Sequence, residues 1–151
     1  MRRPNDVVSP AFVLSLFSGV GGLDLGFRLA NPNARTVCYV ERDEYAAAVL
    51  VARIKDKALS DAPLWSDVTT FDGRSWRGAV DTIIGGFPCQ NISNAGKREG
   101  ITGDRSSLWA EYARLIDEVR PTWVFIENVP PLVTRGLGRV LQDLADLGYD
   151  A

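Results

Sequence analysis

The chain has 151 residues, 46% of them hydrophobic, which is enough for one domain with a single buried core. Its net charge of −2 excludes a surface that is basic all over, and the absence of histidine excludes Ser-His-Asp and Cys-His catalysis and most catalytic zinc sites. Cys38 and Cys89 lie too far apart in sequence for a metal-binding pair, so we expect no metal. Without a membrane-spanning stretch or signal peptide, the composition favours a soluble protein of the reducing cytoplasm.

Hydrophobic periodicity predicts strands and helices that alternate along the chain. In order, it predicts a strand at 12–17, a helix at 23–30, a strand at 36–40, a helix at 45–59, strands at 62–65 and 80–84, a helix at 107–119 capped by Ser106, a strand at 122–126 and a helix at 137–147 that stops at Gly148. Strands separated by helices indicate an α/β fold with a doubly wound, mostly parallel sheet that binds ligands at the carboxyl ends of its strands. No repeat or linker is visible, so residues 1–151 are expected to form one domain.

The first predicted strand runs into the sequence FSGVGG at 17–22. Its three glycines are Gly19, Gly21 and Gly22. They allow a tight turn that brings the amides at a helix N-terminus close to a ligand. A dinucleotide fingerprint needs a further glycine three residues after the second, where Asp24 stands instead. The spacing therefore argues against an NAD-dependent oxidoreductase.

Two carboxylates follow the next two predicted strands. Glu41, about twenty residues beyond the glycine turn, is placed to accept hydrogen bonds from ribose hydroxyls, and its alternative is a solvated loop carboxylate. Asp67 is placed to accept a hydrogen bond from the amine of an adenine, and its alternative is the cap of a turn. Because these groups share one edge of the sheet with the glycine turn, together they predict a pocket for an adenosyl group.

A thiol and a second acidic group follow the last two predicted strands. The run GGFPCQ at 85–90 sets Cys89 on a sharp loop, where a cysteine acts as a nucleophile if its thiolate is stabilised. Glu127 follows the neighbouring strand and is a candidate general acid that faces the same substrate. The alternatives are a buried structural cysteine, a paired carboxylate, and an Asn128 that only satisfies backbone groups of a turn.

Taken together, these residues resemble the C5-cytosine DNA methyltransferases, which use S-adenosyl-L-methionine. The resemblance covers about 13–148 and implies a Rossmann-like methyltransferase fold. The matching motifs are FSGVGG at 17–22, Glu41, DV at 67–68, GFPCQ at 86–90, DRSSL at 104–108 and ENV at 127–129.

The resemblance implies a covalent mechanism. The cysteine matching Cys89 adds to C6 of a cytosine while the glutamate matching Glu127 hydrogen-bonds N3 and the exocyclic amine, which makes C5 nucleophilic. C5 then takes the methyl group, and loss of the C5 proton and of the thiolate restores the ring. Pro88 and Asn128 accompany these two residues in the matching catalytic motifs.

The resemblance also implies binding roles for S-adenosyl-L-methionine and for DNA. The residues implied to hold the cofactor are Phe17 at the adenine, Glu41 at the ribose, Asp67 and Val68 at the adenine edge, Leu108 in the pocket wall, and Gly19, Gly21, Gly22 and Leu23 in the turn. Arg42 departs from the family, which often places an apolar residue there. The target base is implied to flip out of the duplex, with Ser93, Lys97 and Arg98 at the DNA. Solvated loop charges are the alternative for the two cations.

The sequence lacks the Gln-x-Arg-x-Arg motif, the target-recognition domain and the last helix of the family. It therefore resembles an incomplete catalytic domain, truncated after about five strands, from an enzyme of DNA methylation and restriction-modification. An inactive remnant and one subunit of a split enzyme, completed by a second chain, are alternatives. A further alternative is a methyltransferase of transfer RNA, because a related group uses the same thiol and glutamate on that substrate. Sheet edges left open by truncation favour poor solubility of the chain alone.

Overall fold

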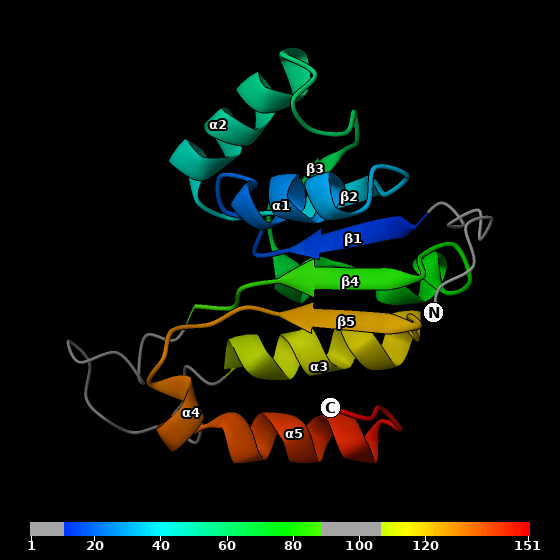
Figure 1. Cartoon of the computed structure of the whole chain (residues 1–151), viewed down its shortest axis with the longest axis vertical. Helices are drawn as coiled ribbons and strands as arrows, with labels where there is room; N and C mark the ends of the chain where they lie inside the picture. Colours follow the sequence, from blue (N-terminus) through cyan, green and yellow to red (C-terminus); the bar gives the residue numbers. More distant parts are fainter. Residues whose placement is uncertain (1–10, 89–106) are drawn as a thin grey trace, which may run out of the picture.

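The computed structural model describes residues 11–88 and 107–151. These residues form a five-stranded sheet with the order β3-β2-β1-β4-β5, and every neighbouring pair is parallel (Figure 1). The strands are β1 (Phe12–Leu16), β2 (Arg35–Val40), β3 (Leu64–Trp65), β4 (Thr82–Gly85) and β5 (Trp123–Ile126). The order proceeds outward from β1 in both directions, which confirms the predicted doubly wound α/β sheet.

Helices connect the strands on both faces of the sheet. They are α1 (Gly22–Ala30), α2 (Glu44–Lys55), α3 (Ser107–Val119), α4 (Leu132–Arg135) and α5 (Leu137–Asp146), with short 3-10 turns η1 (Val68–Thr70) and η2 (Gly73–Trp76). In Figure 1, α3 runs along the sheet and α5 lies on its outer side. The helix α3 therefore lies in the interior, between the sheet and α5.

The core follows from the alternation of side chains along the strands. Leu14 and Leu16 of β1 point to one face of the sheet and pack with Ile83 of β4 and with Leu115 and Ile116 of α3. On the other face, a smaller cluster joins β2 to α2 and to the loop behind it: Tyr39, Leu50 and Leu59. The larger cluster makes α3 the main support of the sheet.

The register aligns the carboxyl ends of the strands. Leu16 lies opposite Val40 on one side and Gly85 on the other, and Gly85 lies opposite Ile126. The segments that follow β1, β2, β4 and β5 therefore open at one edge of the sheet. The glycine turn, Glu41, the segment from Gly86 to Pro88 and the ENV motif at 127–129 begin at this edge.

Several element bounds differ from those predicted. The strand at 12–17 ends at Leu16, because Phe17 has a left-handed φ of 50°. The helix at 45–59 ends at Lys55, because Lys57 has a φ of 61°, so that Leu59 turns back into the smaller cluster. The helix at 107–119 is confirmed as α3, whereas its predicted cap, Ser106, lies outside the described residues.

Apolar side chains are exposed along the edge strand β5 and on α1. Trp123 and Phe125 of β5 are 63% and 45% exposed, and Leu29 of α1 is 75% exposed. In α1 the one buried side chain is that of Asp24. Within the described residues, no helix is both long and apolar enough to cross a bilayer.

Candidate active site

The glycine turn after β1 depends on backbone conformations and space that only glycine supplies. Gly19 and Gly21 have left-handed φ values of 54° and 79°. A Cβ atom on Gly21 would lie 2.5 Å from Leu59 and 2.9 Å from Leu50, so this glycine packs directly on the smaller cluster. Gly22 begins α1. The predicted tight turn between strand and helix is confirmed.

Glu41 connects the glycine turn to the start of α2. Its Oε2 atom accepts a hydrogen bond of 2.7 Å from the amide of Gly19, and its Oε1 atom accepts one of 2.7 Å from the amide of Asp43. The side chain is half-buried and is not the solvated carboxylate of the alternative. Both carboxylate oxygens keep free lone pairs, since an ionised carboxylate accepts about four hydrogen bonds, so this group can also receive two hydroxyls.

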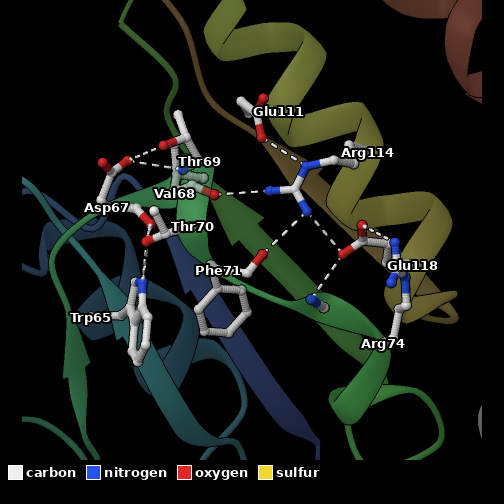
Figure 2. A network of polar contacts seen from close by, with 11 residues as sticks. Trp65, Asp67, Val68, Thr69, Thr70, Phe71, Arg74, Glu111, Arg114 and Glu118 are labelled. Atoms are coloured by element: carbon white, nitrogen blue, oxygen red, sulfur yellow. Dashed lines mark hydrogen bonds and ion pairs between the residues drawn. The ribbon is translucent and has the colours of Figure 1, made fainter.

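Asp67 caps the η1 turn after β3, as its alternative predicted. Its Oδ1 atom accepts hydrogen bonds from the amide of Thr69 at 2.9 Å and from the hydroxyl of Thr69 at 2.8 Å (Figure 2). The backbone hydrogen bond, then the hydroxyl, lowers the pKa of Asp67. Among the described residues no donor reaches Oδ2, which leaves that oxygen available to a ligand. Val68, which follows, is buried.

An aromatic cluster on α3 lies beneath the site. The ring of Tyr112 stacks on Phe17 at 6.0 Å and on Trp109 at 5.8 Å, and meets Phe87 edge to face at 6.4 Å. Its hydroxyl donates to the carbonyl oxygen of Phe125 at 3.2 Å, and burial raises its pKa. Tyr112 thereby joins the ends of β1, β4 and β5. Leu108, the predicted wall residue, is half-buried one turn before it.

The sequence analysis missed Trp109, Tyr112 and Phe87. The signal was present, because Trp109 and Tyr112 are three residues apart on a predicted helix and therefore share one face. Only the fold brings Phe87 and Phe17 to that face.

Glu127 lies against the backbone that leads to Cys89. Its amide donates to the carbonyl oxygen of Gly85 at 3.0 Å, and a Cβ atom on Gly86 would lie 2.5 Å from its Oε2 atom. Glu127 is exposed, so its carboxylate can meet a substrate. Asn128 donates from Nδ2 to the carbonyl oxygen of Phe87 at 2.9 Å and accepts from the amide of Val129. These contacts hold the segments after β4 and β5 together.

A buried polar network lies behind the glycine turn. The hydroxyl of Ser15 lies 2.9 Å from Asp24 Oδ2 and also 2.9 Å from Ser18 Oγ, and the hydroxyl of Thr36 donates to Asp24 Oδ1 at 3.1 Å. Burial raises the pKa of Asp24, although these hydrogen bonds act in the opposite direction. The network fixes the first turn of α1 to β1 and β2.

Four of the predicted site residues lie outside the described residues and stay predictions: Cys89, Ser93, Lys97 and Arg98. Pro88 is the last described residue of its segment and is exposed. The other cysteine, Cys38, is buried, and burial raises the pKa of its thiol to about 11, so it is not a nucleophile at neutral pH. Within 11–88 and 107–151 no group of three metal-binding side chains occurs.

The described part of the site joins the glycine turn, Glu41 and Asp67 to the Glu127 carboxylate beside Gly86, and comparison with known proteins identifies the family of the chain. The model of the C-5 cytosine-specific DNA methylase family matches residues 12–151. The chain belongs to this family. Two relatives are the type II methyltransferase M.Eco47II of Escherichia coli, 36% identical over 145 residues, and M.PspPI of Psychrobacter sp. (strain TA137), 37% identical over 145 residues. Each alignment covers 91% of the chain and 32% of the relative.

Solved structures confirm the fold of this DNA methylase family member. The crystal structure of S. pombe Dnmt2 methyltransferase superposes with a TM-score of 0.69 at 22% identity, over 93% of the chain and 41% of that protein. A mutant of Spodoptera frugiperda DNMT2 also gives 0.69, at 18% identity, over 91% of the chain and 41% of that protein. Family and fold imply S-adenosyl-L-methionine as the cofactor. The chain spans about a third of the length of its curated relatives.

Proposed function

We propose that this chain is the catalytic segment of a DNA (cytosine-5-)-methyltransferase, which transfers a methyl group from S-adenosyl-L-methionine to C5 of cytosine in DNA. The observation that carries the proposal is the position of the Glu127 carboxylate against Gly86, three residues before Cys89, with Asn128 joined to Phe87. This arrangement supports a site in which an acid and a nucleophile act on the same substrate. Membership of a DNA methylase family supports DNA as that substrate.

The chain's own residues carry the steps at the cytosine. The Cys89 thiolate forms a bond to C6 while Glu127 holds N3 and the exocyclic amine, so that negative charge placed in the ring is stabilised and C5 becomes nucleophilic. The cofactor supplies an electrophilic methyl group on a sulfonium. After the methyl group is on C5, a base removes the C5 proton, the bond between sulfur and C6 breaks, and the Cys89 thiolate is regenerated. Pro88 and Asn128 hold the loop and the glutamate in place.

The adenosyl group occupies the edge where the glycine turn, Glu41 and Asp67 meet. Glu41 accepts hydrogen bonds from the two ribose hydroxyls through the lone pairs of its carboxylate that the amides of Gly19 and Asp43 do not use. Asp67 accepts the adenine amine on Oδ2, and Val68 lies at the adenine edge. Further contacts come from the turn and the wall: Phe17, Gly19, Gly21, Gly22, Leu23 and Leu108. The carboxylates and the close-approach turn that the structure contains match the donors of an adenosyl group.

DNA contacts are assigned to Ser93, Lys97 and Arg98, with the two cations at phosphates and the target base flipped from the duplex. The chain matches about a third of its curated relatives, and we assign target recognition to parts of the enzyme outside that third. The exposed Trp123 and Phe125 on the edge strand support a covering partner. The names of the type II relatives favour a role in restriction-modification, and we place the enzyme in the cytoplasm.

Methyl transfer and covalent trapping test the proposal. The full chain, alone or with a complementing chain, is incubated with labelled S-adenosyl-L-methionine and duplex DNA, or with DNA that carries 5-fluorocytosine. A base cannot remove fluorine from C5 as it removes the proton, so the bond between sulfur and C6 does not break and the adduct appears as a covalent complex. We expect Cys89→Ser to abolish both signals and Cys38→Ser to keep them. Transfer to structured RNA in preference to DNA would favour the transfer RNA alternative, and no transfer under any condition would favour the inactive remnant.

A further inference from the structure

The guanidinium of Arg114 on α3 makes four hydrogen bonds within the chain (Figure 2). Its Nε donates to Glu111 at 2.7 Å and its Nη1 donates to Glu118 at 2.9 Å. The same group donates to two backbone carbonyl oxygens, that of Phe71 from Nη1 at 3.1 Å and that of Val68 from Nη2 at 2.9 Å. Charged donors make strong hydrogen bonds to carbonyl groups, so Arg114 fixes both ends of the η1 turn to α3.

Glu118 extends this attachment to the next turn. Its Oε2 atom accepts from the amide of Gly73 at 2.8 Å in addition to Arg114. A Cβ atom on Gly73 would lie 3.0 Å from Glu118 and from Leu115, so η2 lies tightly against the helix. The segment after β3 is therefore held to α3 at three backbone positions.

The turn fixed in this way carries Asp67. Besides the cap from Thr69, the indole Nε1 of Trp65 donates to the carbonyl oxygen of Asp67 at 3.0 Å and lies 3.1 Å from Thr70 Oγ1 (Figure 2). Backbone and cap are thus set independently of any ligand, and Oδ2 of Asp67 remains the acceptor at the edge of the sheet. Hydrogen bonds from Trp65 and Arg114 therefore hold both ends of η1.

We infer that Arg114 is a positioning residue for adenine recognition. By holding the carbonyl groups of Val68 and Phe71, it fixes the direction in which Oδ2 of Asp67 points. The inference rests on the proposed function and deepens it, since it names the support behind the adenine contact. Arg114 itself touches no ligand in this scheme, because its four hydrogen bonds direct the guanidinium to Glu111, Glu118 and the two carbonyl groups. A carboxylate held rigidly in place accepts a hydrogen bond from the amine of adenine. A base with a carbonyl oxygen at that position places an acceptor opposite the carboxylate, makes no hydrogen bond there and binds more weakly.

The chemistry of the site calls for arginine. The planar fork reaches two carbonyl groups and two carboxylates at once, whereas the ammonium of lysine is a point charge and cannot span them. Arg114→Lys therefore keeps the charge and loses the geometry. Arg114→Gln loses both. If position rather than charge matters, the two variants behave alike.

The test measures binding of two cofactor products to the purified chain by calorimetry. These are S-adenosylhomocysteine and its inosine counterpart, in which a carbonyl oxygen replaces the adenine amine. For the wild type we expect preference for the adenine compound of about tenfold or more. In Arg114→Lys and Arg114→Gln we expect the ratio of dissociation constants to fall toward one, with faster amide exchange at 68–71. Arg139→Gln is the matched control, since Arg139 makes an exposed pair with Asp143 on α5, and it keeps the ratio.

Glu111→Gln removes one partner of Arg114 at the surface and guards against a failure of the Arg114 variants to fold. We expect it to lower the ratio partially and in the same direction. A ratio that stays at the wild-type value in every folded variant overturns the inference while leaving the proposed function intact. Failure of the wild-type chain to bind S-adenosylhomocysteine instead contradicts the proposed function, and with it this inference.

Discussion

The Nδ2 atom of Asn128 donates a hydrogen bond of 2.9 Å to the carbonyl oxygen of Phe87. This bond crosses from the segment after β5 to the segment after β4, at the last residues before Pro88. The two segments are thus joined through the backbone of one and the side chain of the other. The position of Phe87 relative to the start of the segment after β5 depends on this bond.

Asn128→Asp tests the hydrogen bond between Asn128 and Phe87. The change replaces a donor by an acceptor that faces the carbonyl oxygen of Phe87, so we expect adduct formation with 5-fluorocytosine DNA to fall by at least about tenfold and stability by about 1 kcal/mol. Asn31→Asp is the control, because Asn31 uses its side-chain oxygen as an acceptor and lies at the opposite edge of the sheet. Equal adduct yields in both variants would contradict the prediction.

Gly86→Ala tests the contact between Glu127 and the backbone. The added methyl group would lie 2.5 Å from Oε2 of Glu127, so the carboxylate must move. We expect methyl transfer to fall by about tenfold to a hundredfold, with little change in melting temperature. Gly138→Ala on α5 meets nothing within 4 Å and should keep activity. Unchanged transfer in Gly86→Ala would show that Glu127 has no fixed position in the reaction.

Asp24 predicts a pH dependence of stability. Its folded pKa is raised by burial, so the folded chain retains a proton that the unfolded chain has released, and the free energy of unfolding falls as pH rises through the folded pKa. Asp24→Asn removes this dependence and should be more stable than the wild type by on the order of 1 kcal/mol at pH 8. Urea titrations from pH 4 to pH 8 measure it, with the exposed Asp61→Asn as control. If the free energy of unfolding of Asp24→Asn falls with rising pH as steeply as that of the wild type, Asp24 is excluded as the cause.

Thiol reactivity separates the two cysteines. Cys38 is 3% exposed and its pKa is about 11, so in the folded chain it is shielded and protonated at pH 7.5. We expect one equivalent of iodoacetamide to react with the native chain, at Cys89, and a second only after unfolding. Mass spectrometry of the alkylated peptides gives the answer. Labelling of Cys38 in the native chain would mean that the interior opens readily.

The exposed edge of the sheet predicts self-association of the chain alone. Trp123→Lys places a charge on the edge strand, where charges block pairing between strands, and should increase the monomer fraction in sedimentation. Tyr45→Lys is matched, because Tyr45 is also exposed but lies on α2. A monodisperse wild-type monomer would contradict the prediction.

The sequence predicted the sheet, the turn and the carboxylates, because strand periodicity and glycine spacing are local signals. It offered a turn capped by Asp67 as an alternative, but it did not predict that Arg114, from a helix more than forty residues later, holds this turn. In sequence, Glu111, Arg114 and Glu118 have the spacing of ordinary ion pairs on a helix surface, and only the fold turns that face toward the η1 carbonyls. The same holds for Tyr112, two of whose ring partners, Phe17 and Phe87, come from segments outside α3. The Cys89 loop lies outside the described residues, so its placement stays a prediction.

The central place of α3 has a consequence for how the protein is made. The glycine turn, Glu41 and the Asp67 turn leave the ribosome well before α3 does, and until then the Val68 and Phe71 carbonyls lack Arg114 and the ring of Phe17 lacks Tyr112. A nascent chain therefore exposes an incomplete cofactor surface until residues 107–119 have emerged. Chaperone demand during synthesis should concentrate in that interval.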